Sequence, residues 1–146
     1  MTYIDKATSL IKKFEGLKLH WYKCPAGKDT IGYGHVIQAS ERHLYEPITQ
    51  SIAEDLLKVD VQYFAEKVTK LIKVGLTDNE LAAIISFVYN IGVGAFKTST
   101  MLKLINKGDK NQACFEFSKW VYVKGKKSKG LINRRIAEAK MFRGEA

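Results

Sequence analysis

The chain has 146 residues, of which 46% are hydrophobic and 27% are charged, a balance that fits one globular domain and excludes a largely disordered chain. The formal net charge of +9 predicts attraction to polyanions such as nucleic acid, anionic lipid or an acidic cell-wall polymer. No apolar run approaches the roughly 18 residues of a transmembrane helix, and the charged N-terminal segment is unlike a signal peptide, so we expect a protein that folds in a cytoplasm.

The N-terminal part predicts one helix followed by a small antiparallel sheet. Apolar residues recur at helical spacing from Thr2 to Glu15, and the glycine that follows can end this helix. The next residues alternate between apolar and polar, which is the period of a strand. Cys24–Lys28 has the composition of a turn, residues 30–34 form a second short strand, and a third strand is expected near residues 36–37.

The rest of the chain predicts helices. A long helix from about Thr49 to Lys73 begins either at Thr49 or at a Ser51–Glu54 capping box. A second capping box, Thr77–Glu80, precedes a nearly continuous apolar segment that should form the buried centre. The remaining predicted elements are a helix at about 99–108, a helix capped by Asp109 that carries Trp120, a basic loop at 124–130, and a last helix at Leu131–Phe142.

This order of elements predicts an α+β fold. We expect a single domain over residues 1–146. A small N-terminal lobe that contains the β-hairpin, at about residues 15–50, would be joined by the long helix to a larger helical lobe. The helical lobe would contain residues 75–146 together with the helix at residues 2–15. A cleft between two lobes is a usual place for a substrate.

Glu15 is the first candidate for chemistry. It lies four residues after Ile11 and therefore shares the inward face of the first predicted helix. Partial burial and the negative end of the helix dipole both favour the protonated form of a carboxyl group, which can then act as a general acid. An ordinary surface glutamate is the alternative. The hairpin can bring Cys24 and Thr30 to the same helix end, where the hydroxyl of Thr30 could hold a water molecule.

Together these residues resemble a known family. Glu15 is followed after eight residues by Cys24, and after five more by Thr30 and IGYGH. This order is similar to the motif of the phage-type lysozymes, glycoside hydrolase family 24. Further agreement covers most of the chain, in order: FEGLKL at 14–19, Tyr22, FVYNIG at 87–92, Phe96 and GLINRR at 130–135.

The resemblance implies a lysozyme-like fold and an endolysin. Such an enzyme cleaves the β-1,4 bond between N-acetylmuramic acid and N-acetylglucosamine in bacterial peptidoglycan. Glu15 would protonate the glycosidic oxygen, and Thr30 would help to place the attacking water. Arg134 would pair with the glutamate. Because Thr30 suggests a held water, hydrolysis is favoured over the alternative, a lytic transglycosylase, which would leave an anhydro-muramoyl product.

Other residues are assigned to the cleft or to its support. Asn90 would line the cleft as a polar side chain. Tyr22 and Trp21 could stack on sugars, although packing against neighbours is the alternative for Trp21 and the favoured interpretation for Trp120. His35 would belong to a structural ion pair, without a catalytic role.

Cys24 stands where the better-known members of the family have the catalytic aspartate. A free thiol, with a pKa of about 8.5, is mostly neutral at pH 7. A neighbouring cation such as Lys23 or Lys28 could lower that pKa and produce a nucleophilic thiolate. General base, covalent nucleophile and water holder are alternative roles. Asp29 is the nearest spare carboxylate, but strand alternation relative to Thr30 should point it away from the site.

The segment from Lys119 to Arg143 holds nine basic residues and one acid, Glu138. This charge predicts contact with anionic outer-membrane lipid, so a non-enzymatic membrane-disrupting protein is an alternative function. Nucleic-acid binding has no recognition motif to support it, and we expect no specific nucleic-acid partner.

The two cysteines, Cys24 and Cys114, are too few for a disulfide framework and lack zinc-site spacing. Two free thiols are the simpler interpretation, with Cys114 in the core. We expect no metal or organic cofactor and a monomeric protein. As a phage or prophage product, it would stay in the host cytoplasm until a holin releases it to the periplasm.

Overall fold

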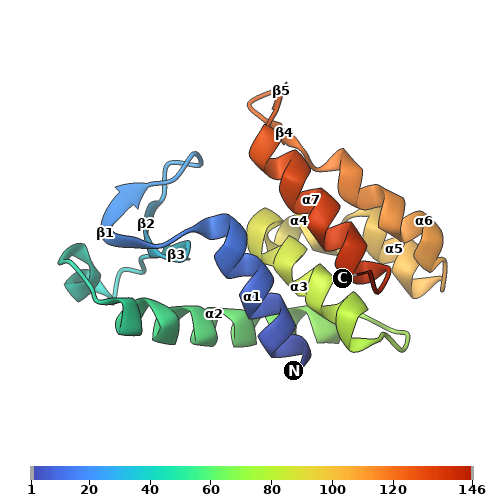
Figure 1. Cartoon of the computed structure of the whole chain (residues 1–146), viewed down its shortest axis with the longest axis horizontal. Helices are drawn as coiled ribbons and strands as arrows, with labels where there is room; N and C mark the ends of the chain where they lie inside the picture. The colour runs from blue at the N-terminus through green and yellow to red at the C-terminus, as the bar shows by residue number, and fades with distance from the viewer. Residues whose placement is uncertain (1, 146) are drawn as a thin grey trace.

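The computed structural model describes residues 2–145 (Figure 1). The elements in chain order are α1 (Tyr3–Glu15), β1 (Lys18–Lys23), β2 (Asp29–Gly32), β3 (His35–Val36), the 3-10 helix η1 (Arg42–Tyr45), α2 (Gln50–Leu71), α3 (Asp78–Ile91), α4 (Val93–Lys97), α5 (Thr100–Asn106), α6 (Lys110–Glu116), the 3-10 helix η2 (Phe117–Lys119), β4 (Tyr122–Val123), β5 (Lys126–Lys127) and α7 (Lys129–Phe142). The predicted α+β class is confirmed.

Helix α1 has well-defined ends. The hydroxyl of Thr2 accepts a hydrogen bond from the N–H of Asp5, and the carboxylate of Asp5 accepts one from the N–H of Thr2, which completes a capping box. At the other end Gly16 has a φ of 71°, which glycine adopts without the strain that a side chain would cause. The helix therefore ends at Glu15, on an element whose inner face is buried in the core.

The N-terminal sheet is antiparallel, with strand order β1-β2-β3. Tyr22 pairs with Thr30, and Lys23 pairs with Asp29. Directly paired residues project from the same face, and neighbouring residues in a strand project from opposite faces. The register therefore places Tyr22 and Thr30 on one face of the hairpin, and Lys23 and Asp29 on the other.

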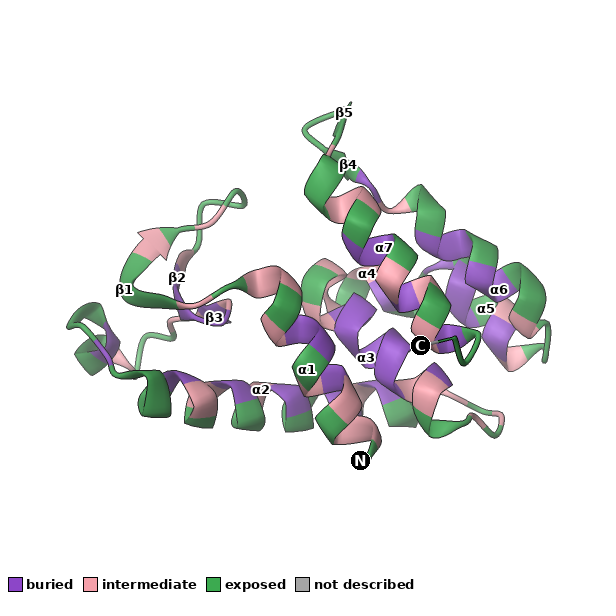
Figure 2. Cartoon of the chain, viewed as in Figure 1, coloured by how far each residue is buried: buried purple, intermediate pink, exposed green. Residues whose placement is uncertain are grey.

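Helix α2 runs from the sheet to the helical part of the molecule (Figure 1). The hydroxyl of Thr49 accepts from the N–H of Ile52, so the helix is capped by Thr49 rather than by a Ser51–Glu54 capping box. Helix α3 contacts α1, α2 and α7, and its residues from Ala82 to Val88 are buried (Figure 2). The prediction that this apolar segment forms the centre is confirmed.

Two local expectations were wrong, and one was incomplete. The sequence predicts that Gly92 and Gly94 end the apolar helix; Gly92 does cap α3, but Gly94 lies inside a further short helix, α4, that begins at Val93. The helical segment with Cys114 ends at Lys119, before Trp120. The expected basic loop contains the hairpin β4–β5, whose turn residues Lys124 and Gly125 have φ values of 50° and 80°. Two positive φ values suit a two-residue hairpin, but asparagine and glycine are the usual residues there, so the sequence carried no standard hairpin signal.

Both cysteines are free thiols. Within residues 2–145 the structure contains no helix that is both long enough and apolar enough to span a bilayer.

Candidate active site

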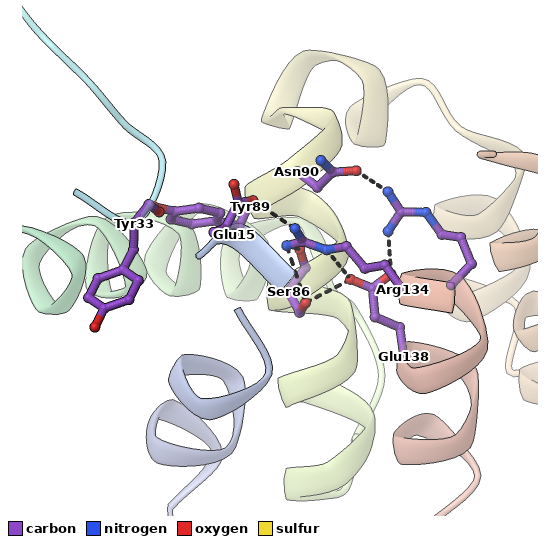
Figure 3. A network of polar contacts seen from close by, with 8 residues as sticks. Glu15, Tyr33, Ser86, Tyr89, Asn90, Arg134 and Glu138 are labelled. Carbon is purple, nitrogen blue, oxygen red and sulfur yellow. Dashed lines mark hydrogen bonds and ion pairs between the residues drawn. The ribbon is translucent and has the colours of Figure 1, made fainter. Parts of the chain in front are cut away.

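Glu15 is the last residue of α1, and its side chain is 20% exposed. Its Oε2 accepts a hydrogen bond from Nη1 of Arg134 at 2.7 Å, so the expected pairing of these two residues is present. Figure 3 shows the guanidinium reaching from α7 toward the end of α1. The acid is thus held by a partner that lies 119 residues away in the sequence.

The turn after β2 also meets Glu15. A Cβ added at Gly34 would lie 2.8 Å from Oε1 and 3.2 Å from Cδ of Glu15, and Gly34 has a φ of 87°. Any other residue would therefore be strained and would push into the carboxylate. Tyr89 fixes the same turn by donating its hydroxyl proton to the carbonyl oxygen of Tyr33 at 2.7 Å. Gly34 had no assigned role in the sequence analysis, although it lies within the IGYGH motif.

The guanidinium of Arg134 is held from its inner side as well. Its Nε donates to Oε2 of Glu138 at 3.2 Å, and its Nη2 donates to the carbonyl oxygen of Ser86 at 3.0 Å. The hydroxyl of Ser86 donates to the same oxygen of Glu138 at 2.7 Å. Glu138 is fully buried, and the sequence analysis gave it no role. Its spacing of four residues from Arg134, on one helix face, is the signal that could have found it.

Arg135 extends this network to Asn90. Its Nη1 donates to Glu138, its Nη2 donates to Oδ1 of Asn90, and its Nε donates to the carbonyl oxygen of Trp120 at 2.9 Å. The guanidinium also lies 4.9 Å from the centroid of the Phe87 ring, and Trp120 packs edge-on against that ring, as expected for a structural tryptophan. The orientation of Asn90 is thus set by Arg135.

Cys24 begins the turn of the β1–β2 hairpin. Its N–H donates to the carbonyl oxygen of Lys28 at 2.9 Å, and the N–H of Gly27 donates to the carbonyl oxygen of Cys24 at 2.8 Å. Burial by itself would raise the pKa of the Cys24 thiol. Hydrogen bonds from the backbone N–H groups of Lys28 and Ala26, together with the polar side chain of Thr30, outweigh burial and lower this pKa below its usual value.

The expected cause of this lowering was wrong. Backbone N–H groups favour the thiolate, whereas the ammonium groups of Lys23 and Lys28 are not among the causes. The Nζ of Lys23 instead pairs with Asp29 at 2.6 Å. Tyr45 donates its hydroxyl proton to the other carboxylate oxygen of Asp29, also at 2.6 Å. Asp29 therefore faces away from Thr30, as expected from strand alternation.

Thr30 is buried, and its hydroxyl donates to the carbonyl oxygen of Lys28 at 2.9 Å. A hydroxyl group has one proton and two lone pairs, so its oxygen can accept a hydrogen bond from a water molecule while this bond is made. Tyr22 pairs with Thr30 across the strands. Burial, Glu15 and Cys24 together raise the pKa of Tyr22. Tyr22 and Thr30 are thus neighbours across the hairpin, and the electrostatic influence of Glu15 and Cys24 reaches the phenol of Tyr22.

Trp21 lies apart from this group. Its ring packs edge-on against the Tyr45 ring, with 5.3 Å between the two centroids. The ammonium of Lys23 lies 5.9 Å from the centroid of the Trp21 ring. These neighbours belong to the face of the hairpin opposite to Thr30. A sugar-stacking role for Trp21 stays a prediction, and so does the cleft between the lobes.

His35 is held between two carboxylates. Its Nδ1 lies 2.7 Å from Oδ2 of Asp60, and its Nε2 lies 2.9 Å from Oε1 of Glu41. Burial opposes a charge on the ring, but Asp60 and then Glu41 outweigh burial and raise the pKa of His35 to about 9. The expected structural ion pair is confirmed. Within residues 2–145 no group of three or more His, Cys, Asp or Glu side chains is placed to hold a metal ion.

This arrangement agrees with comparisons to known proteins. A family model described as phage lysozyme matches residues 12–138. The chain belongs to the phage lysozyme family. It is 45% identical over 136 residues to an endolysin of Bacillus phage PZA, which covers 92% of this chain and 52% of that protein. It is 44% identical over 142 residues to an endolysin of Acyrthosiphon pisum secondary endosymbiont phage 1, covering 94% of this chain and 95% of that protein.

A solved structure supports the same assignment. The endolysin from Escherichia coli O157:H7 phage FAHEc1 is 41% identical to this chain, with a TM-score of 0.83, and the match covers 97% of this chain and 93% of the other. The lysozyme-like fold expected from the resemblance is therefore confirmed. The chain spans about half the length of the two Bacillus phage endolysins that it matches, 52% and 54%.

Proposed function

We propose that this phage lysozyme is an endolysin that hydrolyses the β-1,4 bond between N-acetylmuramic acid and N-acetylglucosamine of bacterial peptidoglycan. The observation that carries the proposal is the placement of Glu15. Arg134 holds its carboxylate at 2.7 Å, Gly34 approaches it from the turn after β2, and the electrostatic influence of Glu15 and of Cys24 reaches Tyr22.

In the proposed reaction Glu15 gives its proton to the glycosidic oxygen as the bond breaks. The carboxylate that remains is stabilised by the guanidinium of Arg134, whose own position is fixed by Ser86 and Glu138. The acid, Glu15, therefore lies on α1, and the cation that stabilises its carboxylate, Arg134, lies on α7. Pre-arranged groups of this kind lower a barrier because they need not reorganise during the reaction.

The hairpin would supply the second half of the reaction. We propose that the Cys24 thiolate, favoured by backbone N–H groups, stabilises the oxocarbenium-like sugar. The hydroxyl oxygen of Thr30 would accept a hydrogen bond from the attacking water, and the proton that this water loses on forming the new C–O bond would pass to the Cys24 thiolate or to bulk water. We expect Glu15 to be essential, Thr30 important and Cys24 contributory. A thiolate can also act as base or nucleophile, and a covalent glycosyl–sulfur intermediate trapped by mass spectrometry would assign the nucleophile role.

Mass spectrometry of digested walls tests the reaction type. A hydrolase leaves a reducing N-acetylmuramic acid end, whereas a lytic transglycosylase leaves the anhydro form. We expect the reducing end, and we expect Glu15→Gln to abolish turbidity loss of permeabilised Gram-negative cells. Glu66→Gln, an exposed glutamate on α2, is the matched control. Parental clearing by Glu15→Gln would remove the catalytic assignment, and anhydro ends would favour the transglycosylase.

We further propose that the basic segment from Lys119 to Arg143 contacts anionic lipid. The ion pairs found among residues 2–145 leave Lys124, Lys126, Lys127 and Lys129 without a carboxylate partner, which supports a role for them outside the fold. If the protein were purely a non-enzymatic membrane disruptor, its Glu15→Gln variant would still kill cells. This outcome separates membrane disruption from peptidoglycan hydrolysis.

For its site of action, we propose that the protein works as a monomer on the wall and reaches it from the host cytoplasm with the help of a holin. The support is its similarity to phage endolysins. Fractionation of host cells with and without a co-expressed holin tests the route, because the proposal requires the lysozyme to appear in the periplasm only when the holin is present.

A further inference from the structure

A groove of about 520 Å³ lies on the helical part of the molecule, bounded by α6, η2, the β4–β5 hairpin and α7. Apolar side chains line much of it, among them Phe115, Val121, Tyr122, Ile132 and Ile136. Arg134 and Glu138, which belong to the active site, are on the buried side of α7. The groove is therefore a second feature of α7 that does not include Glu15 or Arg134, although Arg135, which donates to Glu138, also lines it. The proposed reaction makes no use of the groove.

Large apolar side chains around this groove face water. Phe115 is 68% exposed, Tyr122 is 56% exposed and Ile136 is 50% exposed, and Val123 of the same hairpin is 38% exposed. In Figure 2 the hairpin is coloured as exposed. Soluble monomers rarely keep clustered aromatic and aliphatic groups in water without using them, so such a patch marks a contact surface.

The margin of the groove is cationic. Lys119, Lys127 and Arg143 line it, and no Asp or Glu belongs to the lining within the part of the chain that the structure describes. Lys119 and Arg143 have local partners, Glu116 and Glu145, at 2.6 Å each. The positive charge that remains available is therefore concentrated on the hairpin.

The turn of the β4–β5 hairpin adds to this exposed positive charge. Lys124 is the non-glycine residue with positive φ in the described chain, at 50°. A left-handed conformation is strained for a residue with a side chain, and asparagine or glycine would be the less strained choice. Residues Tyr122 to Lys127 are all exposed, so the strained lysine gains no packing within the fold. Its charge projects into solvent beside Lys126.

We propose that this groove and hairpin form a docking surface for an anionic phospholipid bilayer. Phe115, Tyr122 and Ile136 would enter the interfacial layer, and the hairpin lysines would lie among the headgroup phosphates. Exposed aromatic and aliphatic groups ringed by lysine are the combination that such an interface binds. A polysaccharide or a nucleic acid would match the charge but would leave the apolar centre unburied. The inference refines the lipid contact proposed above and does not depend on hydrolysis.

Co-sedimentation of the full chain with vesicles tests the surface. We compare vesicles of phosphatidylglycerol and phosphatidylethanolamine with vesicles of phosphatidylcholine. The parent should bind the anionic vesicles preferentially. The double variant Phe115→Ser/Ile136→Ser should bind them at least about tenfold more weakly, since burying one large apolar side chain is worth about tenfold. Replacing Lys124, Lys126 and Lys127 by Gln should cost about fivefold for each lysine.

The matched control is Val59→Ser/Tyr63→Ser on α2, where the side chains are 68% and 52% exposed; it should bind the vesicles like the parent. Equal binding by the parent and the groove variant would overturn the proposal and leave adsorption by charge alone. A parent that dimerises without lipid, while the groove variant stays monomeric, would also overturn it, because the groove would then be occupied by a second copy.

Catalysis provides an independent measurement. All groove and hairpin variants should digest lipid-free peptidoglycan at the parental rate. Glu15→Gln should bind vesicles like the parent, even though it cleaves nothing. A failure of lipid docking is thus distinguishable from a failure of the proposed enzyme function.

Discussion

The ion pair around His35 makes the stability of this protein depend on pH in a defined direction. The pKa of His35 is raised from 6.5 to about 9 in the folded protein. Below about pH 6.5 the ring carries its charge in both the folded and the unfolded state, so the stabilisation by Asp60 and Glu41 is fully present. As the pH rises from about 6.5 to about 9, the unfolded ring is already neutral and this contribution is progressively lost.

The size of the effect follows from the same values. Each tenfold change in proton affinity is worth about 1.4 kcal/mol, so the rise from 6.5 to about 9 sets an upper limit of about 3–4 kcal/mol. Both carboxylates are partly exposed, at 23% for Glu41 and 21% for Asp60, and water screens such pairs. We therefore expect a loss of about 2 kcal/mol across this pH range.

At low pH, Glu41 gives the stability the opposite dependence on pH. Burial raises its pKa, but hydrogen bonds from the N–H of Gln38 and from His35 lower it below 4.5. Its contribution is present above about pH 4.5 and is lost as the pH falls through its lowered value. The pair as a whole should thus stabilise the fold most between about pH 4.5 and pH 6.5.

Urea unfolding at a series of pH values from about 5 to about 9.5 measures this dependence. The control is His35→Asn, which should be less stable than the parent at pH 6 and should approach it at pH 9. His20→Asn, an exposed histidine on β1, should follow the parent throughout. If the difference between the parent and His35→Asn stayed constant from pH 6 to pH 9, the reasoning about the charged ring would be refuted.

Three further predictions concern the site. Gly34→Ala should lose about 1–3 kcal/mol of stability and about ten- to hundredfold in kcat, because its Cβ would lie 2.8 Å from Oε1 of Glu15. Urea unfolding and turbidity loss measure the two effects. Gly94→Ala is the control and should behave like the parent, because a Cβ added at Gly94 has no atom within 4 Å. Glu138→Gln should lower the free energy of urea unfolding by about 3–5 kcal/mol, since it removes the buried anion that pairs with Arg134, and a loss below 1 kcal/mol would contradict this. Iodoacetamide at pH 7 should alkylate Cys24 faster than a model thiol, because its lowered pKa increases the thiolate fraction; peptide mass spectrometry measures this rate, and a rate no faster than the model thiol would contradict it.

Much of the fold could be predicted because its signals are local. The Thr2 capping box and Gly16 fix both ends of α1 within a few residues, so Glu15 could be placed at a helix end. Strand alternation correctly put Asp29 on the face opposite to Thr30. In each case the deciding interaction joins residues that are close in the sequence, where spacing reports geometry directly.

The parts that could not be predicted depend on contacts between distant segments or on backbone geometry. The approach of Gly34 to Glu15 requires the turn after β2 to fold against the end of α1, and no spacing encodes that distance. The lowered pKa of Cys24 arises from backbone N–H groups of its own turn, whereas a sequence displays only the side chains of Lys23 and Lys28. The β4–β5 hairpin could not be predicted, because a lysine occupies the turn position where asparagine or glycine usually indicates a hairpin.

The buried ion network around Arg134 lowers the free energy that folding gains. Arg134, Arg135 and Glu138 are at most 3% exposed, and removing such charges from water is expensive even when they are paired. Apolar residues of similar size could fill the space between α3 and α7 with equal or greater stability. An apolar side chain, however, could not place a cation 2.7 Å from Glu15. Glu138 and Ser86 hold the inner side of the guanidinium and leave Nη1 directed at the acid. The network therefore makes sense as a device that holds Arg134 against Glu15, at a stability cost that packing alone would not require.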